Sequence, residues 1–242
     1  KGTASGTVAN GAEVELTGNK SIGIYAADGI NLVNSKNITS TGGSNNIASY
    51  VGGNSTLTSN GNITMTGMDN IGIYTGKGSG INNGAIDLTG STGTSSAGMV
   101  AKTDTSSDTA SVENKNAITV GSNLGMYVAG NGTSSGKNTG TITATTGTGV
   151  YVDGAAHSFN GTGGTIASNA VGIYLENTGA NKITAGTLNI ASGGVGVFGE
   201  NAKIDFAVNV TGTGAVGVAA ETGTVISGNI TTGQDSVGAY VL

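Results

Sequence analysis

The sequence predicts an all-β fold, a right-handed single-stranded parallel β-helix of about ten coils of roughly 24 residues each. Three observations carry this prediction. They are an unusual composition, a short motif that returns along the whole chain, and runs of alternating apolar and polar residues bounded by turn-forming residues.

The composition matches no ordinary globular domain. The 242 residues include 46 glycines but no proline, cysteine or tryptophan, and only 10% are charged. Disorder is not expected, because 36% of the residues are apolar and the net charge is only -5. Collagen is excluded, because proline is absent and the glycines keep no three-residue period. We therefore expect a regular structure with a core of small residues.

Charge and cysteine content narrow the possible partners. All nine cationic residues are lysine and the chain is acidic overall, so we expect no nucleic-acid partner. Without cysteine there are no disulfides or thiolate metal sites. The chain does not start with a signal peptide and has no apolar run of about 18 residues, so we expect an excised or mature segment that is anchored elsewhere.

One motif, apolar-Gly-apolar-aromatic, recurs with local variations at intervals of 21 to 27 residues. Its ten copies begin at Ile22, Ile47, Ile71, Ala97, Leu124, Thr148, Val171, Val195, Val216 and Val237.

A second apolar position recurs between successive copies of the first motif. It is an Ile, Val or Leu that usually precedes a polar residue and often a Thr-Gly pair. Its members are Val14, Ile38, Ile63, Ile86, Ile118, Ile142, Ile166, Leu188, Val208 and Ile230.

A third, weaker run falls between the other two in several units, for example at residues 30–33 and 204–206. Three short strands, with Gly and Asn at the corners where a positive φ is needed, make one triangular coil. Stacking at the inter-strand spacing of about 4.8 Å gives a rod roughly 50 Å long, which we expect to span residues 1–242 as one solenoid.

Alternation along the first strand predicts which side chains face inward. The apolar set Ile22, Ile24 and Ala26, or Val171, Ile173 and Leu175 in a later coil, should fill the interior, leaving Gly23 and Tyr25 outside. A tyrosine ring could then cover the bare glycine backbone of a neighbouring coil. The opposite register would expose ten rows of Ile and Val to water, and is disfavoured for that reason.

These repeats resemble the passenger domains of autotransporter adhesins of the fusobacterial kind. The similarity rests on units such as Asn70-Ile71-Gly72-Ile73-Tyr74-Thr75-Gly76 followed by Gly80-Ile81-Asn82-Asn83-Gly84-Ala85-Ile86, and it covers essentially the entire chain. The fourteen-residue head repeats of trimeric autotransporters are not matched.

The resemblance implies a fragment of a longer, secreted passenger on the bacterial cell surface. It would be exported through, and anchored by, a C-terminal outer-membrane barrel that is absent from this chain. Such passengers act in cell adhesion and virulence by binding proteins or glycans of host or bacterial surfaces. No cofactor is implied.

The residues two positions after each aromatic suggest a ladder of acids, namely Asp153, Glu176, Glu200 and Glu221. Unit charges about 5 Å apart repel by roughly 1 kcal/mol in water, so a cation such as calcium could relieve them. The alternative, which we favour, is that the side chains splay apart and stay solvated, and no metal site is expected.

The outward aromatic residues form the best candidate binding column, because exposed rings stack on sugars and apolar surfaces. The alternative is a ladder that only stabilises strand pairing. The column comprises Tyr25, Tyr50, Tyr74, Tyr127, Tyr151, Tyr174, Phe198 and Tyr240.

A carbohydrate-active β-helix, a polysaccharide lyase or a glycosidase, is the alternative to a non-enzymatic scaffold. Glu176 and Glu200 could in principle serve as paired carboxylates. However, arginine is absent, the fourteen acids are scattered, and His157 is the only histidine, expected in a loop. We therefore expect no enzymatic activity and no catalytic residues.

Two irregularities interrupt the repeat. The interval from Ile86 to Ile118 stretches to 32 residues, which predicts a protruding loop over residues 102–116. Threonines near several second anchors could suggest a flat ice-binding face, but Asp87, Ala167, Asn189 and Asn209 interrupt that column, so ice binding is not expected.

Overall fold

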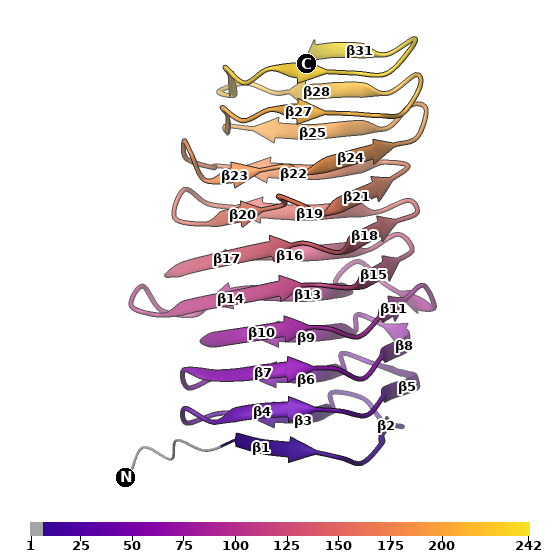
Figure 1. Ribbon diagram of the computed structural model, residues 1–242, viewed down its shortest axis with the longest axis vertical. Coiled ribbons are helices and arrows are strands. Elements are labelled where there is room, and N and C mark those ends of the chain that lie inside the picture. The colour runs from indigo at the N-terminus through magenta and orange to yellow at the C-terminus, as the bar shows by residue number, and fades with distance from the viewer. Residues whose placement is uncertain (1–6) are drawn as a thin grey trace.

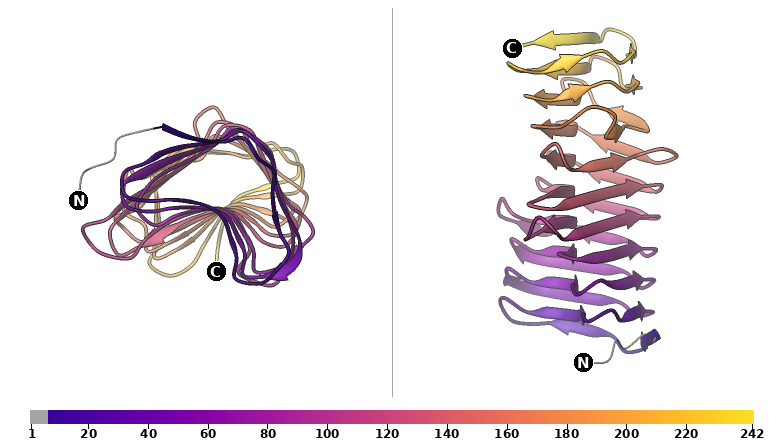
Figure 2. Two further views of the ribbon diagram at one scale, coloured as in Figure 1. Left: turned by 90° about the horizontal axis from the view of Figure 1, so that it is seen from below. Right: turned by 90° about the vertical axis from the view of Figure 1, so that its left-hand side faces the viewer.

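The computed structural model describes residues 7–242, and all regular secondary structure in that range is β-strand. The strands stack in parallel as a β-solenoid of about ten turns of about 24 residues, as Figure 1 shows, so the predicted fold class is confirmed. Seen along its axis, the chain winds around one continuous interior (Figure 2). Within the described range no helix has the length and apolar character needed to cross a membrane.

The strands of successive coils form three long sheets, which we call sheets A, B and C, and most coils contribute one strand to each. Sheet A corresponds to the weak third run of the sequence. Its strands, in spatial order, are β1 (Thr7–Asn10), β4 (Asn31–Asn34), β7 (Ser55–Ser59), β10 (Gly78–Asn82), β14 (Thr109–Asn114), β17 (Thr133–Asn138), β20 (Ser158–Asn160) and β23 (Ile183–Thr184).

Sheet B carries the second anchors. Its strands are β2 (Val14–Leu16), β5 (Ile38–Ser44), β8 (Ile63–Met68), β11 (Ile86–Leu88), β15 (Ala117–Val120), β18 (Thr141–Ala144), β21 (Thr165–Ser168) and β24 (Thr187–Ile190), with β12 (Ser91–Thr92) also beside β8.

Sheet C carries the first motif and runs through all ten coils. Its strands are β3 (Ile22–Ala26), β6 (Ile47–Val51), β9 (Ile71–Thr75), β13 (Ala97–Thr103), β16 (Leu124–Gly130), β19 (Thr148–Asp153), β22 (Val171–Glu176), β25 (Val195–Glu200), β28 (Val216–Ala220) and β31 (Val237–Val241). Near the C-terminal end, two further pairs continue the other faces, β26 (Lys203–Ile204) with β29 (Val225–Ile226) and β27 (Val208–Asn209) with β30 (Ile230–Thr231).

The repeats stack in register, so equivalent residues become neighbours. Tyr50 pairs with Tyr74 in sheet C, and Ile63 pairs with Ile86 in sheet B. The second anchors from Ile38 to Val208 are at most 1% exposed, and they form the core together with inward residues of the other sheets. Ile, Val and Leu therefore stack on themselves along the whole interior, which is how short strands share one hydrophobic core.

The inward and outward faces of sheet C differ from the prediction at the first two motif positions. Ile173 and Leu175 are buried and Tyr174 lies outside, as predicted, but Val171 is only half-buried and Gly172 is buried. The ladder pairs the residues on either side of the glycine, Val171 with Val195 and Ile173 with Val197. Strict alternation is therefore interrupted at the glycine, which shifts the residue before it outward.

Close approach of the coils explains why this position is glycine. A Cβ on Gly149 would lie 2.6 Å from the carbonyl oxygen of Gly172 in the next coil and 2.3 Å from Cγ2 of Ile166. The prediction that tyrosine rings cover this column was wrong. The glycine beneath a ring comes two residues after the aromatic, as at Gly76, where a Cβ would lie 3.1 Å from the Tyr50 hydroxyl.

Buried asparagines hold the corners together. Asn46 and Asn70 are fully buried between sheets B and C. The Asn46 Oδ1 accepts from the Ser21 amide at 2.9 Å, and the Asn70 Oδ1 accepts from the Asn46 amide at 2.9 Å. A second buried ladder follows sheet A, where the Asn114 Nδ2 donates to the Asn138 Oδ1 at 2.8 Å. Asn46 and Asn70 thus satisfy backbone amides that the sheets leave free at the turns, and the Asn114 Nδ2 also donates to the Asn116 carbonyl at 2.8 Å.

The predicted loop over residues 102–116 is much shorter than expected. Strand β13 continues to Thr103 and β14 starts at Thr109, so only residues 104–108 connect them. This connection extends beyond its neighbours at the left of Figure 1. The sequence was misleading because Ala110, Val112 and Asn114 alternate inward within β14 although the flanking run is polar.

We predict that Gly149→Val destabilises the rod by about 1–3 kcal/mol or more, because a branched side chain there must displace packed backbone. Ala48, fully buried at the same motif position, shows that a single methyl can be accommodated. Gly238→Val is the matched control, since a Cβ at that position meets nothing within 4 Å. Denaturant unfolding of both variants is the measurement, and equal losses of stability would contradict this account.

Candidate functional site

The aromatic column lies on the exterior of sheet C and is divided into two runs. In the first run, Tyr25 and Tyr50 stack with ring centroids 5.2 Å apart, and Tyr50 and Tyr74 stack at 5.3 Å. Val100 then occupies the column between Tyr74 and Tyr127 and is only 4% exposed.

The second run covers four consecutive coils from Tyr127 to Phe198. Tyr127 and Tyr151 are tilted at 46° with centroids 5.2 Å apart, and Tyr151 meets Tyr174 edge to face at 4.8 Å. Tyr174 and Phe198 stack at 5.0 Å. Ala219 interrupts the column before Tyr240. The tyrosine-outward register is therefore correct, but the rings form two separate ladders instead of one.

The ladder of acids adjoins the second run. Asp153 pairs in register with Glu176, and Glu176 with Glu200. Glu221 follows the end of β28, and its amide donates to the Gly199 carbonyl at 2.9 Å. The structure thus places the four acids along one edge of sheet C, as the sequence predicted.

The two columns are joined by hydrogen bonds that the sequence analysis missed. The Tyr174 hydroxyl donates to the Glu200 Oε2 at 2.6 Å, and the Tyr151 hydroxyl donates to the Glu176 Oε2. Each tyrosine therefore contacts the acid of the next coil. The signal was present, since residues two apart in a strand share a face and in-register stacking brings each near the neighbouring coil.

These contacts keep the phenols protonated. Burial, followed by the hydrogen bond to Glu176, raises the pKa of Tyr151 above its ordinary value of 10.0, and burial with the bond to Glu200 does the same for the pKa of Tyr174. Burial and the charge of Asp104 raise the pKa of Tyr74 to about 12. The strip formed by the second aromatic run and the four acids thus combines ring faces, donor hydroxyls and carboxylates.

The alignment of these acids does not by itself make a metal site. Among residues 7–242, no group of three or more His, Cys, Asp or Glu side chains lies close enough together to hold a metal ion. The carboxylates of Glu176 and Glu200 instead accept tyrosine hydroxyls.

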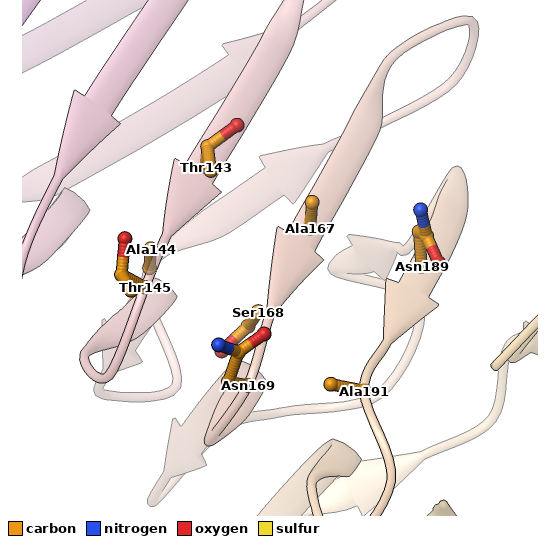
Figure 3. Close-up of a pocket in the computed structure, with 8 residues that line it drawn as sticks. All are labelled: Thr143, Ala144, Thr145, Ala167, Ser168, Asn169, Asn189 and Ala191. Atoms are coloured by element: carbon orange, nitrogen blue, oxygen red, sulfur yellow. The ribbon is translucent and has the colours of Figure 1, made fainter. Parts of the chain in front are cut away.

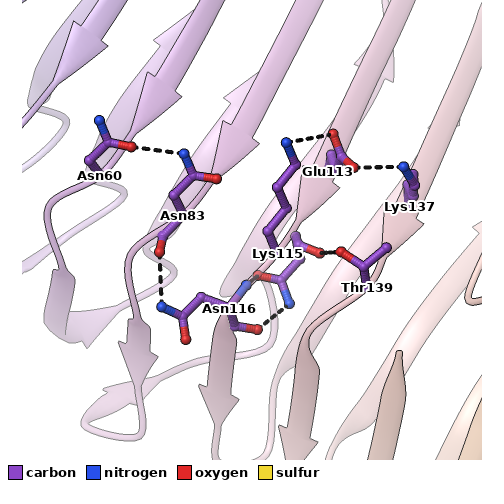
Figure 4. Close-up of polar contacts among 8 residues, drawn as sticks. Asn60, Asn83, Glu113, Lys115, Asn116, Lys137 and Thr139 are labelled. Atoms are coloured by element: carbon purple, nitrogen blue, oxygen red, sulfur yellow. Dashed lines mark hydrogen bonds and ion pairs between the residues drawn. The ribbon is translucent and has the colours of Figure 1, made fainter. Parts of the chain in front are cut away.

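Sheets A and B present polar exteriors. On sheet A, Glu113 forms ion pairs with Lys137 at 2.8 Å and Lys115 at 3.6 Å, and the Asn83 Nδ2 donates to the Asn60 Oδ1 at 2.8 Å (Figure 4). On sheet B, a shallow groove crosses β18, β21 and β24 where the small side chain of Ala167 lies between Thr143 and Asn189 (Figure 3). These faces offer hydroxyls and amides but bring no titratable groups together in the groove.

His157 does lie between strands β19 and β20, as expected, but it is not an exposed loop residue. Its side chain is only 2% exposed, and both ring nitrogens contact the main chain of the preceding coil.

Comparison of the chain with protein-family models, with curated proteins and with solved structures finds no match.

We predict that Tyr151→Phe with Tyr174→Phe destabilises the rod at neutral pH by up to about 1–3 kcal/mol per lost bond, because each hydroxyl donates to a carboxylate. The wild type should also lose stability as pH rises above 10.0, because the phenol pKa values are raised in the folded state. The double variant should lose less over the same range.

The measurement is the thermal midpoint as a function of pH in the alkaline range. Tyr25→Phe is the control, since its side chain is 62% exposed and lies in the other run. The same alkaline loss in wild type and double variant would show that these two phenols do not govern it.

Proposed function

We propose that this chain is a non-enzymatic extracellular scaffold, a stalk or binding segment of a bacterial surface autotransporter adhesin. The observation that supports it most directly is sheet C, which runs unbroken through ten coils and holds aromatic side chains on its exterior. A stack of this kind makes a stiff rod, because no coil can bury its apolar face alone.

The repeats support the same proposal. Successive coils repeat the same motifs, and their buried side chains pack into one shared core. Such a segment gains length by repetition and presents a long regular surface, which suits display away from a cell and contact with proteins or glycans of host or bacterial surfaces.

The arrangement of the carboxylates favours a scaffold over a carbohydrate-active enzyme. Glu176 and Glu200 occupy equivalent positions on adjacent coils, and each accepts a hydroxyl from the tyrosine of the preceding coil. Glycoside hydrolysis needs two carboxyl groups whose environments differ, so that one is the acid and the other the base or nucleophile. The repeat gives these two groups similar environments.

The test is attachment of the purified segment, immobilised on beads, to partner cells and glycan arrays, with turnover of polysaccharides measured in parallel. We expect no turnover of polysaccharides. Attachment would identify the chain as a binding segment, and no attachment would identify it as a spacer between flanking parts. Release of products from any polysaccharide by the unaltered segment would contradict the non-enzymatic proposal.

Replacing Tyr127, Tyr151 and Tyr174 together by Ser tests the role of the aromatic column. We expect a lower thermal midpoint, because each aromatic pair contributes about 0.5–1.5 kcal/mol, and unchanged attachment by the folded variant. Thr64, Thr119 and Thr143, replaced together by Ser on the exterior of sheet B, are the control. An unchanged midpoint with lost attachment would instead assign the column as the contact surface.

A further inference from the structure

His157 replaces backbone pairing at one corner of the rod. It ends the turn that starts at Gly154, where its own amide donates to the Gly154 carbonyl at 3.2 Å. The ring reaches the corner of the preceding coil. There its Nδ1 lies 3.1 Å from the Ser134 amide nitrogen, and its Nε2 lies 3.1 Å from the Gly130 carbonyl oxygen.

These two contacts fix the ring in one neutral tautomer. A backbone amide can only donate, so Nδ1 must be the acceptor, and a carbonyl can only accept, so Nε2 must carry the proton. Ser134 is fully buried, and the His157 ring is the partner of its amide. Protonation of Nδ1 would set two donors against each other inside a corner that excludes water.

Few charges near this ring could compensate for protonation. Residues 130–134, which face it from below, contain no titratable side chain, while Asp153 is on its own coil and Glu176 and Lys182 are on the coil above. Burial lowers the pKa of His157 below its ordinary value of 6.5, and the Gly130 carbonyl and the charge of Asp153 oppose this only in part.

We propose that His157 is an acid-sensitive latch, whose protonation releases the Gly154–His157 corner from residues 130–134 while the three sheets remain paired. The sheets hold because their ladders on either side, β16 with β19 and β17 with β20, do not involve the ring. The proposal does not depend on what the rod attaches to.

The sign of the pH dependence follows from the neutral ring. The contribution of His157 to stability is fully present above the unfolded-state pKa of about 6.5 and is lost as pH falls below it toward the lower folded-state pKa. The corner should therefore open in mildly acidic surroundings and close again near neutral pH.

The experiment uses NMR on the whole segment, in which His157 is the only histidine. Ring nitrogen shifts should show the Nε2-protonated tautomer near neutral pH and a titration below 6.5. Exchange of the Ser134 amide, corrected for its intrinsic rate, should accelerate several-fold between about pH 7.5 and pH 5, because the ring nitrogen that accepts this amide becomes protonated. Amides within β16 and β19 should change little.

Two variants distinguish the effect of the His157 ring from that of the nearby Asp153 carboxylate. His157→Gln should exchange faster at Ser134 near neutral pH and show little further change on acidification. Asp153→Asn should keep the latch but move its opening to lower pH, because the Asp153 charge favours the protonated ring.

Two results would overturn the proposal. One is a ring that titrates at or above 6.5 with no change in Ser134 exchange, measured on the unaltered segment. The other is a His157→Gln variant that retains the wild-type response to acid.

Discussion

Parallel, in-register pairing between successive coils is the constraint on which the rest of this structure depends. The strands of one coil make their ladder hydrogen bonds with the coils before and after it, so each residue's nearest neighbours are its equivalents one repeat away. The glycines of sheet C follow from it, because a Cβ at Gly149 would lie only 2.6 Å from the Gly172 carbonyl oxygen in the next coil. The sequence repeats because the contacts repeat.

In-register stacking has opposite consequences for apolar and charged side chains. Isoleucine on isoleucine or tyrosine on tyrosine is favourable, whereas glutamate on glutamate is not. Glu176 and Glu200 meet this problem by accepting hydroxyls from the neighbouring aromatic column. On sheet A the ladder instead alternates sign, with Glu113 opposite Lys137. In the column of like charges on sheet C, two of the four carboxylates therefore have donors from the adjacent aromatic column.

Periodicity made most of the fold predictable, because repeated spacing reports which residues stack. The second anchors, the outward tyrosines and the aligned acids were all correctly placed. The facing of Val171 and Gly172 was predicted wrongly. The alternation is interrupted where the backbones of neighbouring coils pack closely, and the spacing of residues in the sequence does not show this. The strand at residues 109–114 was not predicted because the residues around it are polar. The hydrogen bonds from Tyr151 and Tyr174 to the acids could be predicted only by considering the aromatic column and the ladder of acids together.

The corners differ from the sheets in what holds them. Where the backbone turns, its amides and carbonyls no longer face equivalent groups of the next coil, and side chains take their place. Asn46 and Asn70 do so between sheets B and C, and the Thr103 hydroxyl accepts from the Gly132 amide at 2.8 Å. Amides and hydroxyls keep these bonds at any physiological pH, but an imidazole does not. His157 stands where an amide or a hydroxyl would keep its bond, so we expect mild acid to act at its corner, while the sheets on either side retain a backbone ladder that does not titrate.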